Sequence, residues 1–129
     1  MEELNRNELE ALRVLWEQGE AKPADIEAAF GWPIDNGTLR SVLRVLVDKN
    51  LVARRKEGKA YMYKAKRSRQ GVMKSMARQM AQVFTGGSAA DLIAQLIKTE
   101  KLKPEELAEL RRIAQLETKT TNPSSQEKR

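Results

Sequence analysis

The chain has 129 residues and a mass of 14.6 kDa, so it fits one domain, or one compact module with an appended helical segment. Apolar residues make up 40% and charged residues 33% of the sequence, which excludes wholesale disorder and leaves a modest core under a strongly solvated surface. Cysteine and histidine are both absent, which excludes disulfides, thiol catalysis and thiolate zinc sites and removes the commonest acid–base residue. We therefore expect no metal site, no cofactor and no enzyme activity.

The basic charge is concentrated in the middle of the chain. Residues 1–37 carry 3 Lys or Arg against 9 acidic residues, whereas residues 38–78 carry 13 against 2, a net charge of +11. A positive surface confined to one segment is typical of a protein that binds a polyanion such as DNA, although a solvated face without a partner is the alternative. No stretch is apolar over the length that spans a bilayer, so we expect a cytoplasmic protein with no membrane partner.

Two amphipathic helices are predicted in the acidic first segment. Asn5 and Glu8 form a capping-box pair before a leucine-rich run that Gly19 ends. Pro23 suits the first turn of a second, short helix that ends at Gly31. The first helix should bury one leucine-rich face, and the core of this region is expected to contain Leu9, Leu12, Trp16, Leu39, Leu43 and Leu46.

A third helix and a hairpin follow in the basic segment. Asn36 can cap the helix, whose inner face is apolar and whose outer face is small, polar and basic. From Leu51 the pattern changes to two short strands, 51–56 and 60–64, joined by a turn at 57–59. Tyr61 and Tyr63 share one side of the second strand and are expected to pack beneath the hairpin, with base stacking as the less favoured alternative.

Three helices followed by a basic hairpin are the order of a winged helix-turn-helix. In that fold the third helix can enter a major groove while the hairpin, or wing, lies along the sugar-phosphate backbone. We predict that Thr38 and Ser41, with Arg40 and Arg44, face the bases. The residues predicted to neutralise phosphates are Arg44, Arg54, Arg55, Lys56, Lys59 and Lys64.

Four stretches of the sequence together resemble the penicillinase repressor family, the BlaI, MecI and CopY group. They are residues 9–16 (LEALRVLW), 38–51 (TLRSVLRVLVDKNL), 55–63 (RKEGKAYMY) and 84–88 (FTGGS), and the matches extend from about Leu4 to Leu116. The resemblance implies a winged-helix dimer that represses promoters with dyad-symmetric operators, often upstream of β-lactamase, receptor-protease or copper-transport genes.

The chain also departs from the pattern of that family. The family often has Tyr-Thr-Thr where this chain has residues 36–38, so only Thr38 carries over directly. Copper-responsive members carry a C-terminal cysteine cluster, which this chain lacks. Penicillin-responsive members have an Asn-Phe cleavage site where this chain has Gln95 and Leu96, so a regulatory protease is a candidate partner and this bond is its candidate site.

Three more amphipathic helices are predicted after the hairpin. Ser68 can cap the first, Ser88 and Asp91 make a capping-box pair for the second, and Pro104 begins the third. Their apolar stripes are best buried against a second copy of the chain, although packing back onto the winged helix is the alternative. The residues predicted to form the dimer interface are Met73, Met76, Met80, Phe84, Leu92, Ile93, Leu96, Ile97, Leu107, Leu110 and Ile113.

The sequence therefore predicts a mainly α protein with a small β-hairpin. Residues 1–67 form a winged-helix DNA-binding domain, residues 68–117 a helical dimerisation domain, and residues 118–129, which are polar and lack periodicity, a disordered tail. The predicted function is that of a homodimeric, sequence-specific DNA-binding transcriptional repressor that occupies a dyad-symmetric operator. The alternative is a winged-helix module that binds an acidic protein partner.

Overall fold

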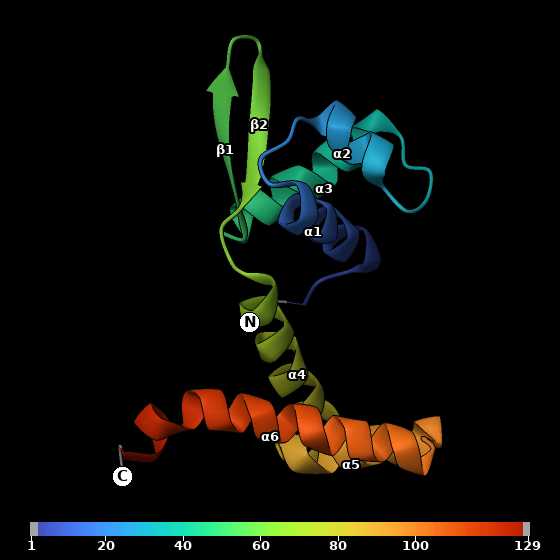
Figure 1. Cartoon of the computed structure of the whole chain (residues 1–129). Coiled ribbons are helices and arrows are strands. Elements are labelled where there is room, and N and C mark those ends of the chain that lie inside the picture. Colours follow the sequence, from blue (N-terminus) through green and yellow to red (C-terminus); the bar gives the residue numbers. More distant parts are fainter. Residues whose placement is uncertain (1–2, 128–129) are drawn as a thin grey trace. The chain divides into compact units, whose positions relative to one another are not determined.

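The computed structural model describes residues 3–127, with side chains described as far as residue 115. The chain divides by its contacts into two units, with the boundary between residues 80 and 81. No helix of the described chain is both long and apolar enough to cross a membrane. The elements, shown in Figure 1, are α1 Arg6–Gln18, α2 Pro23–Ala29, α3 Asn36–Asp48, β1 Val52–Glu57, β2 Ala60–Ala65, α4 Arg69–Thr85, α5 Ala89–Glu100 and α6 Pro104–Glu127.

Local signals set the starts of the first two helices as predicted. The Asn5 side chain accepts a hydrogen bond from the Glu8 N–H at 2.9 Å, and the Glu8 carboxylate accepts one from the Asn5 N–H at 2.9 Å, so the capping box is confirmed. Gly19 ends α1 with a φ of 82°, and Pro23 is the first residue of α2. The second helix stops earlier than predicted, at Ala29, because the next residue is already extended.

The start of α3 differs from the prediction by one residue. Asp35, not Asn36, is the N-cap, because its backbone is extended and its Oδ1 accepts the Thr38 N–H at 2.8 Å. Asn36 is the first helical residue, and its side chain accepts a hydrogen bond from Arg40 Nε at 2.7 Å. The Thr38 N–H and hydroxyl both donate to the Asp35 carboxylate and hold its pKa below the usual value. The cap therefore stays ionised at neutral pH.

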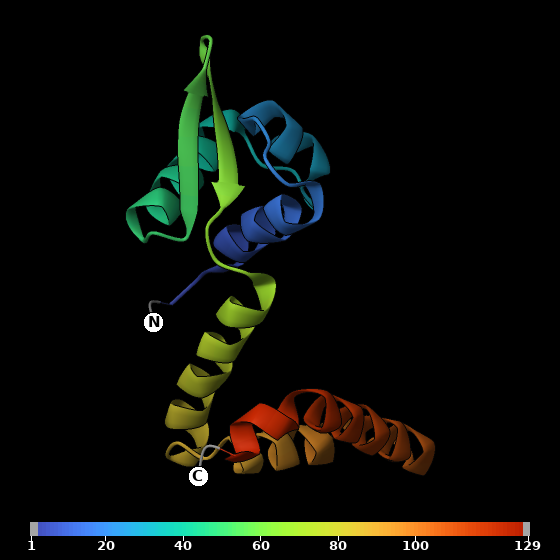
Figure 2. The ribbon, with the colours of Figure 1, turned by 60° about the vertical axis from the view of Figure 1, so that its left-hand side comes forward.

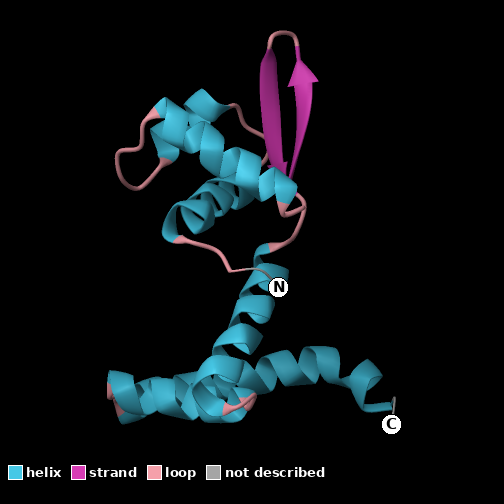
Figure 3. Ribbon diagram, turned by 180° about the vertical axis from the view of Figure 1, so that it is seen from behind, coloured by secondary structure: helices cyan, strands magenta, loops and turns pink. Residues whose placement is uncertain are grey.

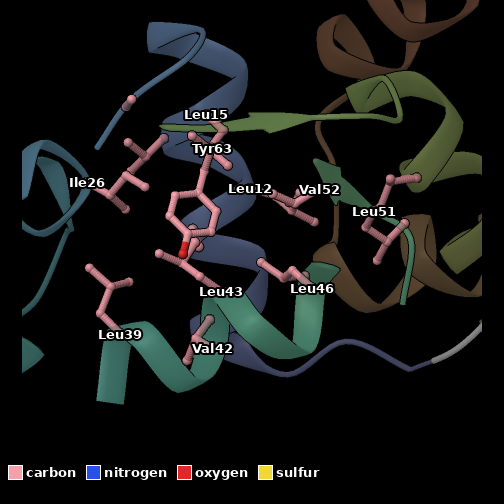
Figure 4. Packing of buried hydrophobic residues seen from close by; sticks show 14 residues of the cluster. Leu12, Leu15, Ile26, Leu39, Val42, Leu43, Leu46, Leu51, Val52 and Tyr63 are labelled. Atoms are coloured by element: carbon pink, nitrogen blue, oxygen red, sulfur yellow. The ribbon is translucent and has the colours of Figure 1, made fainter. Parts of the chain in front are cut away.

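The first unit has one apolar core between its three helices and the hairpin (Figure 4). Leu12, Leu39, Leu43 and Leu46 are fully buried, as predicted. Leu9 and Trp16 are only half-buried. The Trp16 indole lies at the edge of the core, where its Nε1 donates a hydrogen bond to the Arg67 carbonyl oxygen at 2.8 Å. The core also takes in residues from the connections and from α4, namely Ala21, Ile26, Leu51, Val52, Tyr63 and Val72.

A buried carboxylate that the sequence analysis missed connects α1 to the segment that precedes α3. Glu10 is only 8% exposed and forms an ion pair with Arg13 at 2.5 Å. Its Oε2 also accepts the Gly31 N–H at 2.7 Å, and Arg13 Nη2 donates to the Ala29 carbonyl oxygen at 3.1 Å. The Arg13 guanidinium and the Gly31 N–H hold the pKa of Glu10 below its usual value. Two side chains on α1 therefore satisfy backbone groups at the end of α2.

Replacing Glu10 should destabilise the winged helix. We expect Glu10→Ala to lower the free energy of unfolding by about 2 kcal/mol, because it leaves the Gly31 N–H without its acceptor and removes the buried carboxylate partner of Arg13. Glu17→Ala, which removes an exposed partner of the same Arg13, should cost less than about 1 kcal/mol. Because the pKa of Glu10 is lowered in the folded state, its contribution is present above the unfolded pKa of about 4.5 and is lost as the pH falls below it. Denaturant titrations of the three proteins at neutral and acidic pH would contradict this if the two variants lost equal stability.

The strands β1 and β2 form an antiparallel hairpin with a two-residue loop, Gly58 and Lys59 (Figure 3). Gly58 has a φ of 64°, a conformation that costs glycine little. Ala21 adds a third, one-residue strand, since it exchanges two backbone hydrogen bonds with Tyr63 at 2.8 and 2.9 Å. This bridge attaches the base of the hairpin to the connection between α1 and α2, and Tyr63 is buried there, so its predicted packing role is confirmed.

The remaining helices follow the predicted order. The first part of α4 belongs to the first unit, because Val72 is 1% exposed in its core and Met76 packs against that core. Ser88 caps α5 through the Asp91 N–H, and α5 and α6 lie side by side in the second unit (Figure 2). Helix α6 runs to Glu127, past the start of the predicted tail at residue 118. The side chains of that segment and residues 128–129 lie outside the described residues, so the disordered tail stays a prediction. The domain boundary predicted between residues 67 and 68 also stays a prediction.

Candidate nucleic-acid interface

The outward face of α3 carries the polar and basic side chains that were predicted to read DNA. Thr38, Arg40, Ser41 and Arg44 are all exposed, while the apolar residues between them are buried. The Thr38 hydroxyl donates to Asp35 at 3.1 Å and keeps its acceptor lone pairs available. Ser41 and Arg44 have no side-chain hydrogen bond or ion pair among the interactions of the described residues. The helix therefore presents the hydroxyl groups of Thr38 and Ser41 and the guanidinium group of Arg44 on one surface.

The pairing register distributes the wing cations over both faces of the hairpin. Arg54 pairs with Tyr63 and Lys56 with Tyr61, so these two cations share the tyrosine face. The Arg54 guanidinium lies 4.4 Å from the centre of the Tyr61 ring, and the Lys56 ammonium 5.9 Å from it. Tyr61 thus orders two cations rather than offering a free stacking surface. The cations predicted from the sequence as one phosphate-binding set therefore lie on two faces.

The opposite face of the hairpin carries Arg55 and Lys64. Arg55 is already engaged, since it donates twice to Glu20 at 2.7 and 2.9 Å and forms a third contact, at 2.6 Å, with Glu57. Both carboxylates raise the pKa of Arg55, and Arg55 lowers the pKa of Glu20. The donors of Arg55 therefore point at protein carboxylates in this structure, and Glu20 is a charged neighbour of the wing that the sequence analysis missed.

A hollow of about 450 Å³ adjoins the N-terminal end of α3. It is lined by the start of α1, the connector before α3 and one residue of α3 itself. No periodic or motif signal marks such a site, because its walls come from segments about 30 residues apart. The lining residues are Asn5, Arg6, Asn7, Trp32, Pro33, Ile34, Asp35 and Thr38.

The predicted interface residues on α4, α5 and α6 fall into two groups. Leu92 is buried, and Met76, Ile97 and Leu107 are half-buried within their units. The others are exposed although they are large and apolar, which is unusual for side chains that have no partner. Their exposed fractions reach 71% at Phe84, and the group comprises Met73, Met80, Phe84, Ile93, Leu96, Leu110 and Ile113.

The candidate cleavage bond lies inside a helix. Gln95 and Leu96 are in the middle of α5, and the Gln95 carbonyl oxygen accepts the Thr99 hydroxyl at 2.8 Å. Proteolytic nicking favours exposed loop tips over hydrogen-bonded helices. Cleavage of this bond would therefore require α5 to unwind locally.

Among the described residues, no group of three acidic side chains is placed to hold a metal ion.

Three helices, a bridged hairpin and an exposed polar face on the third helix define a winged helix-turn-helix protein of the DNA-binding class. The chain belongs to the penicillinase repressor family, whose sequence model, described as "Penicillinase repressor", matches residues 4–116. Members of this family are transcriptional repressors and not enzymes, which confirms the predicted family and class. A search of curated proteins found no significant match.

Solved structures of bacterial proteins share the fold. A mutant MarR from E. coli is 19% identical over 88% of this chain and 76% of its own, with a TM-score of 0.51. YusO from Bacillus subtilis is 18% identical over 90% and 75%, with a TM-score of 0.51. BpsR from Bordetella bronchiseptica, whose DNA binding is regulated by 6-hydroxynicotinic acid, is 23% identical over 77% and 74%, with a TM-score of 0.50. These likenesses confirm the predicted winged-helix fold.

Proposed function

We propose that this chain represses transcription as a homodimer that occupies a dyad-symmetric operator in double-stranded DNA. The observation that carries the proposal is the outward face of α3, where Thr38, Ser41 and Arg44 are exposed beside a cationic hairpin. A helix of this width fits the major groove, and short hydroxyl side chains allow its backbone to approach the base edges closely. Family membership supports the same function.

The two parts of the interface have different tasks in this proposal. Thr38 and Ser41, with Arg40 and Arg44, contact the base edges, and the wing cations contact phosphates on the strand beside the groove. Lys59 lies in the loop of the hairpin, and in this proposal it contacts a phosphate and no base. The phosphate contacts are assigned to Arg44, Arg54, Arg55, Lys56, Lys59 and Lys64, and Arg55 must exchange Glu20 or Glu57 for a phosphate to take part.

The homodimer is supported by the exposed apolar side chains after the hairpin. Phe84, Ile93, Leu96 and Leu110 are each at least 46% exposed in the protomer, and a second copy of the same surface would cover them. A two-helix readout of a palindrome needs the two α3 helices about one turn of DNA apart, or a multiple of it. The helices of the second unit are the candidate holder of that spacing.

Release of the operator by a regulatory protease is a separate part of the proposal. The candidate bond, Gln95 to Leu96, lies in a helix that belongs to the proposed dimer surface. Its cleavage would divide that surface and thereby weaken the dimer. Incubation with a purified candidate protease, followed by mass spectrometry of the fragments, would identify the bond that is cut.

The decisive experiment is selection of bound sites from random duplex DNA, followed by footprinting. We expect an enriched sequence with two inverted half-sites, protected over both of them. Mobility shifts in excess nonspecific competitor DNA distinguish this function from binding of an acidic protein partner. If no sequence is enriched and no shift survives the competitor, sequence-specific repression fails and the acidic protein partner is the alternative to test.

Substitutions should separate base reading from phosphate contact. We expect Thr38→Ala or Ser41→Ala to change the preference among operator variants by about 1 to 3 kcal/mol for each lost base contact. Lys59→Ala should instead weaken binding to all sequences about equally, because a phosphate carries no sequence information. Competition titrations with single-base operator variants measure both effects. A changed base preference in Lys59→Ala would contradict the assignment of the wing.

A further inference from the structure

The hollow beside α3 contains a cation that is unpaired within the described part of the chain. Arg6 is exposed and makes no ion pair within 4.0 Å with a carboxylate of the described residues, although its charge is among those that lower the pKa of Glu10, one helical turn away. Arg13, the other arginine of α1, is bound to Glu10 and Glu17. The donors of Arg6 are therefore open to a ligand, although this arginine lies in the acidic part of the sequence.

An aromatic side chain positions this arginine. The Arg6 guanidinium carbon lies 4.0 Å from the centre of the Trp32 ring. Trp32 is itself held, since its Nε1 donates to Asn7 Oδ1 at 2.9 Å and its ring meets Phe30 edge-on with centroids 5.6 Å apart. Phe30 packs against the core of the first unit. A guanidinium stacked on a fixed ring loses less side-chain freedom on binding an anion than a free one does.

The carboxylate in the wall of the hollow does not bind Arg6. Asp35 caps α3, and its two oxygens accept the Thr38 N–H at 2.8 Å and the Thr38 hydroxyl at 3.1 Å. The negative charge of Asp35 is thus directed into the helix terminus. The hollow is therefore lined both by Arg6 on α1 and by Thr38 on α3, the residue assigned above to base contact.

We propose that Arg6 is a further DNA contact and binds a backbone phosphate of the operator at the N-terminal end of α3. The inference rests on the proposed function, because it places Thr38 in the major groove. A side chain that shares a hollow with a groove-reading residue, but projects from another helix, reaches the edge of the groove, where the phosphates lie. Trp32 is the positioning residue that holds Arg6 toward that strand.

The test compares Arg6→Gln with Arg111→Gln, a matched loss of one positive charge at an exposed residue of α6 in the second unit. Binding to the selected operator and to an unrelated duplex is measured across a salt series. We expect Arg6→Gln to bind both duplexes about tenfold more weakly. The plot of log affinity against log salt concentration should become less steep, its negative slope decreasing in magnitude by about 1 for each protomer bound. Arg111→Gln should show the affinity and the salt slope of wild type.

A second variant tests the role of the ring. Trp32→Leu keeps the charge of Arg6 and removes the stacking, so we expect binding about threefold weaker with an unchanged salt slope. Thermal unfolding of each variant checks that the winged helix is intact. If Trp32→Leu folds and binds as tightly as wild type, the positioning role is wrong.

The outcomes separate this inference from the proposed function. If wild type binds the operator and Arg6→Gln binds it equally well with the same salt slope, the phosphate contact is wrong and the proposed function stands. If Arg6→Gln alters the preference among base variants, Arg6 reads bases and the phosphate assignment is overturned. If wild type selects no duplex, the proposed function fails, and this inference fails with it.

Discussion

Operator binding should weaken about thousandfold or more when the salt concentration rises from about 50 to about 200 mM, if the dimer makes roughly 6 to 10 phosphate contacts. The expected contacts come from exposed cations on α3 and the wing, such as Arg44, Arg54 and Lys59. Each neutralised phosphate releases condensed counterions, and the entropy of that release falls as salt rises. Mobility shifts or fluorescence titrations over a salt series give the slope. A nearly flat slope with specific binding intact would exclude the wing as an electrostatic clamp.

Arg55 provides an internal comparison for this prediction. Its guanidinium already contacts Glu20 and Glu57, so a phosphate must compete with two carboxylates. We therefore expect Arg55→Ala to reduce the salt slope less than Lys59→Ala does. Equal reductions would mean that Arg55 leaves its carboxylate partners when the protein binds DNA.

Dimerisation should determine operator affinity. Leu96 is 47% exposed in the protomer, so Leu96→Glu should leave the protomer folded and place an unpaired charge in the proposed interface. We expect this change to cost the dimer several kcal/mol and to shift the protein to monomers. Sedimentation measures the association state, and footprinting measures occupancy of the two half-sites.

Ala94→Glu is the matched control for this variant. Ala94 is exposed on the same helix and lies about 160° around it from Leu96, outside the apolar stripe by about 60° from its nearest member, Ile97. The control should remain dimeric and bind normally. If Leu96→Glu becomes monomeric yet protects both half-sites with unchanged affinity, the helices after the hairpin do not hold the dimer together.

Signals between near neighbours in the sequence predicted most of the elements correctly. The capping box of Asn5 and Glu8 and the first-turn Pro23 each act within a few residues, so they could be read without the fold. The cap of α3 shows the limit of such signals. Asp35 and Asn36 are both good capping residues, and only the extended backbone at Asp35 decides between them.

The pairing of charges could not be predicted, because it depends on contacts between distant segments. Arg55 lies 35 residues from Glu20 in the sequence, and the two meet where the hairpin joins the connection between α1 and α2. No local signal marks Glu10 as special, yet it accepts the Gly31 N–H, 21 residues away. Which cations remain available to DNA is therefore a property of the packed chain.

The sequence by itself determined the winged-helix order, the concentration of basic charge in residues 38–78 and the family, since periodicity, capping and composition are local properties. Only the tertiary structure decided that Arg55 is bound to carboxylates and that Arg6 is held over Trp32 beside Thr38. The physical reason is that a charge in a folded protein is available or neutralised according to what packing places within about 4 Å of it.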